Sequence, residues 1–529
     1  LGNIYLKNKG QICVIPLSPK AAYSCRKFNI HYVAWETFIP RNRLVSQRPL
    51  FTKYNNKWTD LIDNTLKNSI QEFRDSDFNP AKLYTMSLHG YLDELNAAQL
   101  IWKEVLNIKK PKSIYIGKKT LKKRAEWSRI LPQQKIIELL LPYFAKISGI
   151  ECINITDDNE KLDVLEKNKK IDFRRRFLNP VKNRVSHANR RQIKLFLKFG
   201  WKTYFESLLK SKLSKDKKRI LFIGGGYDLG ETALYFKKNY HNVELIEFPS
   251  EFIHTAKSKI LNRKKIDEVL KILLKDTNFI NPFSRNGFPL PNIYIQIFSW
   301  WLFEIMPRQW EVYWAAKKID LNAEYLAVVN WAYGEGENSA LIDAFRKSKV
   351  LTVCFQHGGA SRNTWLTDYF QEYLQSDLYL CYGKGQQNSF KKLDKFLENS
   401  FKKPKIIPVG SVRLDNLRLS HRGNNAKCTK NKTQILYIPT LYDHPGFTIN
   451  DDIMIGVEYF NFQLEILEIF SKYPTLNFIY KGFPGSLDIY DTNPIEDVIK
   501  NNNYTNIEYI VDFPITEIMW NADAIIIDH

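Results

Sequence analysis

Along this 529-residue chain, short apolar runs alternate with segments whose apolar residues recur at helical spacing. Residues 113–117 (SIYIG) and 150–156 (IECINIT) are typical of strands, and residues 134–149 between them have the period of a helix closed by Gly149. Residues 12–35 begin with a short apolar run, turn at two prolines and end in a strand-like IHYVAW. Because strands and helices alternate, the pattern predicts a parallel α/β sheet.

The same alternation continues through the second half of the chain. Residues 217–257, 322–359 and 376–417 each contain a strand-like run followed by a polar turn and a helical segment. Residues 418–434 are polar, charged and without apolar periodicity, which indicates a linker. A second α/β run begins at residue 435 with ILYIPTLYDH and extends to the last residue.

Composition narrows the class of protein. The length predicts two or three domains, and a hydrophobic content of 44% is ample for packed cores. The six cysteines are scattered without zinc-ligand spacing, which favours free thiols in a reducing compartment. We find no apolar window long enough to span a bilayer and no signal peptide. The chain starts with leucine and stops directly after a strand-like run, so we expect a fragment.

Positive charge is concentrated in one segment. The chain has a formal net charge of +22. Residues 161–219 contain 20 Lys and Arg against 5 Asp and Glu, a net of +15, with aromatic residues interleaved. This segment fits an anionic membrane surface, with lysine stems along the apolar boundary, or equally a solvated basic face over an ordinary core-facing helix. We find no nucleic-acid-binding motif, so nucleic acid is not expected as a partner.

A glycine-rich turn follows the strand-like residues 219–223. Gly224, Gly225, Gly226 and Gly230 resemble a nucleotide-binding turn, with Glu247 at the end of the next strand. The spacing departs from G-x-G-x-x-G, because Leu229 occupies the third required position. The turn is somewhat similar to the first motif of S-adenosylmethionine-type folds, although a tight turn without any ligand also needs glycines.

The stretch VLTVCFQHGG ends a strand in a histidine and two glycines. At the carboxyl edge of an open α/β sheet, Gly358 and Gly359 would clear space beside His357, whose ordinary pKa of about 6.5 suits proton transfer. The preceding unit ends similarly, with Gly334 and Gly336 before a helix that Asn338 or Ser339 can cap. The alternative is that His357 merely bonds a loop carbonyl.

The second α/β run supplies a comparable edge. Three strand-like runs end in residues suited to bind the phosphates of a nucleotide, provided that the strands are adjacent. These residues are Pro439, Thr440, Asp443 and His444 after the first run, Lys481 and Gly482 after the second, and Asp528 and His529 after the third. Three ordinary strand-to-loop exits are the alternative interpretation.

The order FQHGG, SDLYLCYGKG, PVGSVRLDNL, ILYIPT, FIYKGFP and DFPITEIMWNADAIIIDH resembles the GT-B glycosyltransferases of surface and capsular polysaccharide synthesis and the related CDP-glycerol glycerophosphotransferases. The resemblance covers residues 320–529. It implies an α/β fold of GT-B type, in which two Rossmann-like domains face each other across a cleft. These would be an acceptor domain at 1–417, a linker at 418–434 and a truncated donor domain at 435–529.

The resemblance also implies roles for individual residues. His357 becomes the general base or oxyanion partner, with Asp443 and His444 as further catalytic candidates. Relatives often carry His-Pro after the basic residue, whereas this chain has Lys-Gly-Phe-Pro. The donor-binding candidates are Gly358, Gly359, Gly410, Pro439, Thr440, Lys481, Gly482, Asp528 and His529.

The sequence therefore leads to one main expectation and two alternatives. We expect a metal-independent enzyme without a cofactor, which moves a sugar or polyol-phosphate from a nucleotide-activated donor to a cell-envelope polysaccharide or lipid-linked acceptor. It would be cytoplasmic and attached to the inner face of the membrane through residues 161–219. The alternatives are an S-adenosylmethionine-type transferase centred on Gly224 to Glu247 and a basic membrane-surface binding protein without catalysis.

Overall fold

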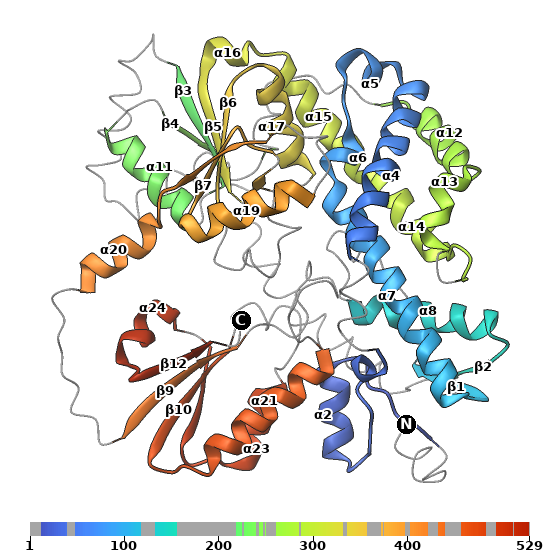
Figure 1. Ribbon diagram of the computed structural model, residues 1–529, viewed down its shortest axis with the longest axis vertical. Helices are drawn as coiled ribbons and strands as arrows, with labels where there is room; N and C mark the ends of the chain where they lie inside the picture. Colours follow the sequence, from blue (N-terminus) through green and yellow to red (C-terminus); the bar gives the residue numbers. More distant parts are fainter. Residues whose placement is uncertain are drawn as a thin grey trace, which may run out of the picture.

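The computed structural model is α/β, with three separate parallel sheets (Figure 1). It describes residues 12–39, 48–117, 133–155, 218–224, 227–239, 243–246, 249, 261–284, 287–331, 336–356, 372–373, 375–396, 403–421, 432–439, 456–482, 494–511 and 513–527. Within these ranges five cysteines are free thiols, namely Cys13, Cys25, Cys152, Cys354 and Cys381.

The largest sheet has six parallel strands in the order β4-β3-β5-β6-β7-β8. Each strand is a short apolar run that precedes a polar turn, as the sequence predicted. The strands are β3 (Arg219–Ile223), β4 (Val243–Ile246), β5 (Tyr325–Trp331), β6 (Leu351–Phe355), β7 (Leu378–Cys381) and β8 (Lys405–Pro408). The chain moves from β3 outward to β4, and then β5 pairs on the other side of β3. This reversal makes the β3/β5 boundary the topological switch point of a doubly wound sheet.

Side chains alternate between the two faces of this sheet, and each face is covered by its own helices. On one face, Phe222 and Val329 pack with Leu229 and Ala233 of α11 (Tyr227–Asn239). On the other face, Leu221, Ile223 and Val328 belong to the main core together with residues of α17 (Glu337–Lys347). The outer strands are followed by α19 (Lys384–Phe396) and α20 (Val412–His421).

The second sheet is also parallel and doubly wound, with the order β11-β10-β9-β12. It consists of β9 (Thr433–Ile438), β10 (Leu476–Lys481), β11 (Ile507–Ile510) and β12 (Ala524–Ile527). The connecting elements are α21 (Gly456–Ser471), α23 (Pro494–Asn502), α24 (Ile515–Ile518) and η8 (Met519–Asn521). Its switch point lies between β9 and β12, which pair directly.

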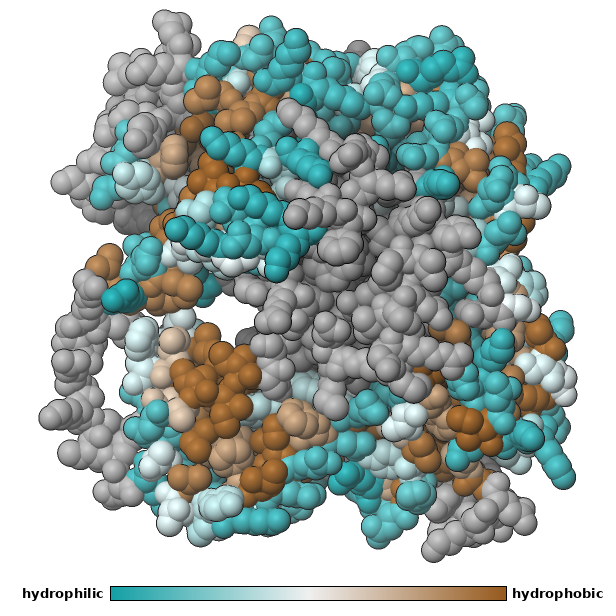
Figure 2. All heavy atoms as spheres, in the orientation of Figure 1, coloured by the Kyte–Doolittle hydropathy of each residue, from teal (hydrophilic) through white to brown (hydrophobic). Residues whose placement is uncertain are grey.

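Edge strand β12 is solvent-exposed along its whole length. Figure 2 shows hydrophobic side chains gathered over the part of the molecule where Figure 1 places β12 and α24. The exposed large apolar residues of this region are Phe513, Trp520, Ile525, Ile526 and Ile527.

The third sheet is a small parallel pair, β1 (Ser113–Gly117) and β2 (Glu151–Ile155). These are the predicted strands, and α8 (Gln133–Ile147) between them ends before Gly149, which has φ of +66° as a helix-closing glycine should. The expected strand IHYVAW is wrong. Within these six residues, Tyr32 alone forms a β-bridge, which pairs it with Val14. No strand extends further, because Trp35 already begins the 3₁₀ helix η1 (Trp35–Phe38).

A helical body packs beside the six-stranded sheet (Figure 1). The apolar run at residues 293–306, too short to span a bilayer, lies within its core, where Trp301 and Leu302 are fully buried. The body consists of α4 (Arg48–Ser69), α5 (Gln71–Ser76), α6 (Pro80–Leu83), α7 (Thr85–Lys109), α12 (Arg263–Leu273), α13 (Thr277–Ile280), η4 (Asn281–Phe283), α14 (Asn292–Trp300), η5 (Trp301–Ile305), α15 (Met306–Lys317) and α16 (Leu321–Glu324). Among the described residues, no helix is both long and apolar enough to cross a membrane.

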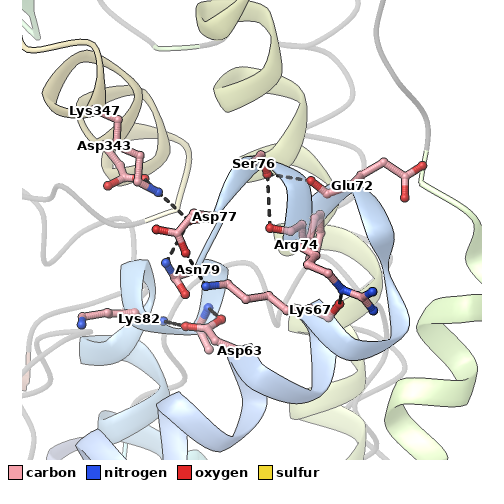
Figure 3. Close-up of polar contacts among 12 residues, drawn as sticks. Asp63, Lys67, Glu72, Arg74, Ser76, Asp77, Asn79, Lys82, Asp343 and Lys347 are labelled. Carbon is pink, nitrogen blue, oxygen red and sulfur yellow. Dashed lines mark hydrogen bonds and ion pairs between the residues drawn. The ribbon is translucent and has the colours of Figure 1, made fainter.

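Polar contacts hold this helical body together and also join it to α17 (Figure 3). The buried carboxylate of Asp63 accepts the backbone N–H groups of Ala81 (2.8 Å) and Lys82 (2.9 Å) at the start of α6. Lys347 of α17 pairs with Asp343 at 2.9 Å and donates to the carbonyl oxygen of Asp77 at 2.6 Å. The six-stranded sheet is therefore anchored to the helices through charged as well as apolar groups.

The first described segment, residues 12–39, packs on the second sheet's helices. The Tyr32 hydroxyl donates to Oδ1 of Asn461 on α21 at 2.6 Å, and α2 (Pro19–Lys27) contacts both α21 and α23. Oε1 of Glu36 accepts the Val457 N–H at 2.7 Å, at the first turn of α21. Sequence position alone would have placed this segment with residues 1–417.

The predicted α/β class is confirmed, and two of the three sheets have the parallel, doubly wound strand order of Rossmann-like domains. Of the predicted linker, residues 418–421 are the last of α20 and 433–434 the first of β9, whereas 422–431 lie outside the described residues. The division into 1–417, 418–434 and 435–529, the cleft between the two domains and the truncation stay predictions.

Candidate functional site

A pocket of about 340 Å³ opens at the carboxyl edge of the six-stranded sheet. Loops after β4 and β5, the two strands that flank β3, both contribute to its wall, so the pocket lies at the switch point. This is where open α/β sheets bind ligands, and the volume is within the usual range for a small-molecule site. The lining residues are Tyr84, Ser87, Pro249, Ile305, Arg308, Gly336, Glu337 and Asn338.

One wall of the pocket is the first turn of α17. Gly336 precedes the helix with φ of +64°, a conformation that a residue with a Cβ rarely adopts. The N-terminal end of an 11-residue helix carries partial positive charge. Burial raises the pKa of Glu337, the first residue of α17; the nearby charge of Arg308 acts against this rise, and that of Glu311 adds to it.

The opposite walls come from the helical body. Tyr84 and Ser87, at the start of α7, are both buried, and the Tyr84 ring stacks on Trp301 at 6.1 Å between centroids. Arg308, in the first turn of α15, is exposed. Neither ion pair nor hydrogen bond engages its guanidinium within the part of the chain that the structure describes. The pocket therefore combines a positively charged side chain with hydroxyl and aromatic groups.

The ends of the neighbouring strands β6, β7 and β8 are joined by hydrogen bonds. Gln356, directly before His357, is buried, and its Oε1 accepts the Tyr382 N–H at 2.9 Å. The buried Asp228 carboxylate accepts the hydroxyls of Tyr382 (3.0 Å) and Ser411 (2.7 Å) and the Arg413 N–H (2.9 Å). Asp228, within the glycine-rich unit, thus holds the start of α20 in place.

Lys481 ends β10 with its side chain buried, 5% exposed. Its ammonium donates to the carbonyl oxygens of Gly482 (2.8 Å) and Val511 (2.9 Å), and so joins the carboxyl ends of β10 and β11. The ammonium therefore lies at the ligand-binding edge of the second sheet, where it also has a structural role.

Three other donor-binding candidates fall on described residues. Gly482 faces β11, because a Cβ added there would lie 2.4 Å from the hydroxyl oxygen of Tyr509, so close packing accounts for this glycine. Gly410 has φ of +80° and open space around it, so backbone conformation accounts for it. Pro439 follows β9 and is buried. Donor binding by these residues stays a prediction.

Most predicted site residues lie outside the described residues, so the structure does not test their roles. These are His357, Gly358, Gly359, Thr440, Asp443, His444, Asp528 and His529. The same holds for nearly all of the basic segment 161–219, for Gly225 and Gly226, and for Glu247. Within the described ranges, no three His, Cys, Asp or Glu side chains gather in a way that would hold a metal ion.

Sequence reasoning identified the α17 side of the pocket but missed Tyr84, Ser87 and Arg308. Gly336 and Asn338 were recognisable because they lie in the polar segment that follows a strand-like run. The other three residues lie on helices that are distant in sequence, and no local motif marks a helical residue that tertiary packing brings to a sheet edge. The one local feature among these three residues is that Arg308 follows a proline at the start of a helical segment.

Comparison with protein-family models and with curated proteins finds no match. Among solved structures, the fold is similar to Phytolacca americana UGT2, complexed with UDP-2-fluoro-glucose and pterostilbene, at a TM-score of 0.27 and 10% identity over 56% of this chain and 72% of that one. It is also similar to a UDP-glucosyltransferase from Polygonum tinctorium capable of glucosylating indoxyl, at a TM-score of 0.25 and 9% identity over 57% of this chain and 72% of that one. Similarity at this level establishes no family membership.

Proposed function

We propose that this protein transfers a sugar or polyol-phosphate from a nucleotide-activated donor to a cell-envelope polysaccharide or lipid-linked acceptor. The observation that supports this most strongly is the charged pocket at the switch point of the first doubly wound sheet. A second doubly wound sheet in the same chain carries the buried Lys481 ammonium at its own carboxyl edge. Two such edges give separate places for an acceptor and for a donor.

The chemistry follows from these assignments. In a sugar transfer, the acceptor hydroxyl oxygen forms a bond to the anomeric carbon, while the bond from that carbon to the nucleotide's phosphate oxygen breaks. His357 takes the hydroxyl proton, a contribution of roughly 10²- to 10⁴-fold in rate. The departing phosphate carries the negative charge, and Lys481 and Thr440 stabilise it without a metal ion.

The cellular setting is also part of the proposal. The basic, aromatic-bearing segment 161–219 would hold the enzyme at the inner face of the membrane, where lipid-linked acceptors are found. Binding to anionic vesicles that weakens with salt, without binding to oligonucleotides, would support this attachment. The matched variant has glutamine in place of the lysines and arginines of 161–219. Persistent vesicle binding by this variant would contradict the attachment.

A ligand screen by thermal unfolding tests the donor class. Nucleotide sugars or CDP-alcohols should raise the melting temperature, because a ligand at 100 times its Kd stabilises the folded state by about 2.7 kcal/mol. His31→Ala, on an exposed histidine of the first segment, serves as a control for handling and purity. A shift with S-adenosyl compounds, and none with any nucleotide-activated donor, would overturn the proposal.

The second candidate is the S-adenosylmethionine-type transferase. One observation favours it: the pocket lies at the switch point beside β3, and β3 leads into the glycine-rich turn at Gly224, which has φ of +92°. Against it, the Asp228 carboxylate of this unit is engaged by Ser411, Arg413 and Tyr382 rather than directed to a ligand. The same thermal screen separates the two candidates.

A further inference from the structure

The switch-point pocket is lined by one positively charged side chain, Arg308, and one acidic side chain, Glu337. Arg308 has no ion-pair partner among the described residues, and the first turn of α17 adds the positive end of its dipole. Burial raises the pKa of Glu337, and the nearby charge of Arg308 acts against that rise. A ligand that carries one negative group would compensate the charge of Arg308.

Polar groups next to the lining residues are incompletely satisfied. Ser339, in the first turn of α17, is 1% exposed, and its hydroxyl has no hydrogen-bond partner in the part of the chain that the structure describes. Gln309, adjacent to Arg308, is fully buried, and both polar atoms of its amide lack a partner there. Buried polar atoms are nearly always hydrogen-bonded in folded proteins. Neither residue is among those that line the pocket, so these groups form a polar interior behind its wall and are not themselves ligand contacts.

The remaining lining favours a sugar ring. The Tyr84 side chain presents an aromatic surface beside Ser87, Asn338 and Glu337, which can hydrogen-bond hydroxyl groups. Arg308 can bind a carboxylate or phosphate with two parallel hydrogen bonds, a geometry that lysine does not provide. A pocket of about 340 Å³ suits one monosaccharide residue with its charged substituent.

We propose that this pocket is an acceptor subsite for an acidic sugar, whose carboxylate or phosphate is bound by Arg308 and whose hydroxyls bond to Ser87 and Glu337. The inference rests on the proposed transfer function, because it assigns the first sheet's pocket to the acceptor. The same anionic chemistry is present in the phosphates of a nucleotide donor, which we assign to the second sheet. The two sources are separable by experiment.

Binding measurements on the whole chain test this subsite directly. Glucuronate and glucose 6-phosphate should bind in calorimetry or ligand-observed NMR, and neutral glucose should bind at least about tenfold more weakly. Arg308→Met should remove this preference, whereas Arg308→Lys should retain only part of it. Lys317→Ala, on an exposed lysine at the other end of the same helix, should bind as the wild type does.

Two outcomes would overturn the inference. Equal binding of glucose and the acidic sugars, or an unchanged preference in a folded Arg308→Met protein, would show that Arg308 recognises no anion. Competition of UDP or CDP with glucuronate would assign the pocket to the donor. Failure of the transfer function is distinguishable, since no nucleotide-activated donor would then bind while acidic sugars still would.

Discussion

At the scale of single residues, two buried ionisable side chains show how the sequence maintains its architecture. Lys481 and Asp63 lie in different parts of the molecule, yet each bonds to two backbone groups. Removing one partner of a buried hydrogen bond costs about 1–3 kcal/mol, because the other partner is left unsatisfied.

Lys481→Met should therefore destabilise the protein by about 1–3 kcal/mol, since the carbonyl oxygens of Gly482 and Val511 lose their donor. Denaturant unfolding measures the loss. The same substitution at Lys472, an exposed residue between α21 and β10, is the control and should be nearly neutral. Equal stability of the two variants would show that the Lys481 ammonium has no structural role.

Asp63→Asn should also destabilise the protein by about 1–3 kcal/mol near pH 5. Burial raises the pKa of Asp63 to about 7, so this loss should shrink as the pH rises through 7. An amide oxygen can accept one of the two N–H groups of Ala81 and Lys82, but its NH₂ group then faces the other donor (Figure 3). The exposed Asp60 lies on the same helix, and Asp60→Asn is its matched control. A loss of stability in Asp60→Asn alone, measured in the same unfolding experiment, would contradict this account.

At the scale of elements, the Glu36 contact holds the first segment to α21. Burial raises the pKa of Glu36 to about 8, while the N–H of Val457 acts against the rise and the charge of Glu458 adds to it. The folded state therefore binds a proton more tightly than the unfolded chain, whose glutamate titrates near 4.5. Its stabilising contribution is complete below about pH 4.5 and is lost as the pH rises through about 8.

Glu36→Gln should remove this part of the pH dependence. The variant should be as stable as the wild type or slightly less stable at pH 5, and more stable than the wild type at pH 9, because glutamine keeps an acceptor for the Val457 N–H without a buried charge. Unfolding at several pH values measures the difference. A wild type that exceeds the variant by a constant amount from pH 5 to pH 9 would show that Glu36 does not titrate in this range.

The elements also show what the sequence could predict. Strands such as β6 and β10 were predictable, because a run of apolar residues before a polar turn has few other structures available. The long helices α4 and α7 were not assigned as a body, since their contacts join segments far apart in the chain. IHYVAW was misjudged because the half-buried Tyr32 and the buried η1 residue Trp35 pack against α21 rather than in a sheet.

The candidate site was predictable only in part, for the same reason. Gly336 and Asn338 follow a strand, so a local pattern marks them. Arg308 reaches the pocket through the packing of α15 against α17, which no local pattern records.

At the scale of the whole molecule, the exposed edge strand β12 predicts self-association of the 529-residue chain. An exposed, uncharged strand at a sheet edge offers unpaired backbone groups and apolar side chains to a second copy. Ile527→Lys should lower concentration-dependent association, as measured by light scattering. Ile469 on α21 is similarly exposed, and Ile469→Lys is the control. Equal association of both variants and the wild type would exclude β12 as the cause.

The whole-molecule account claims that one chain joins a donor edge and an acceptor edge into a transferase. The most direct measurement is acceptor-dependent release of nucleotide from nucleotide sugars and CDP-alcohols, with acidic and neutral sugars as acceptors. We predict release that depends on an acidic acceptor, falls at least about 10²-fold in His357→Ala and is unchanged in His31→Ala. Undiminished release in a folded His357→Ala protein, or no release from any donor, would contradict the account.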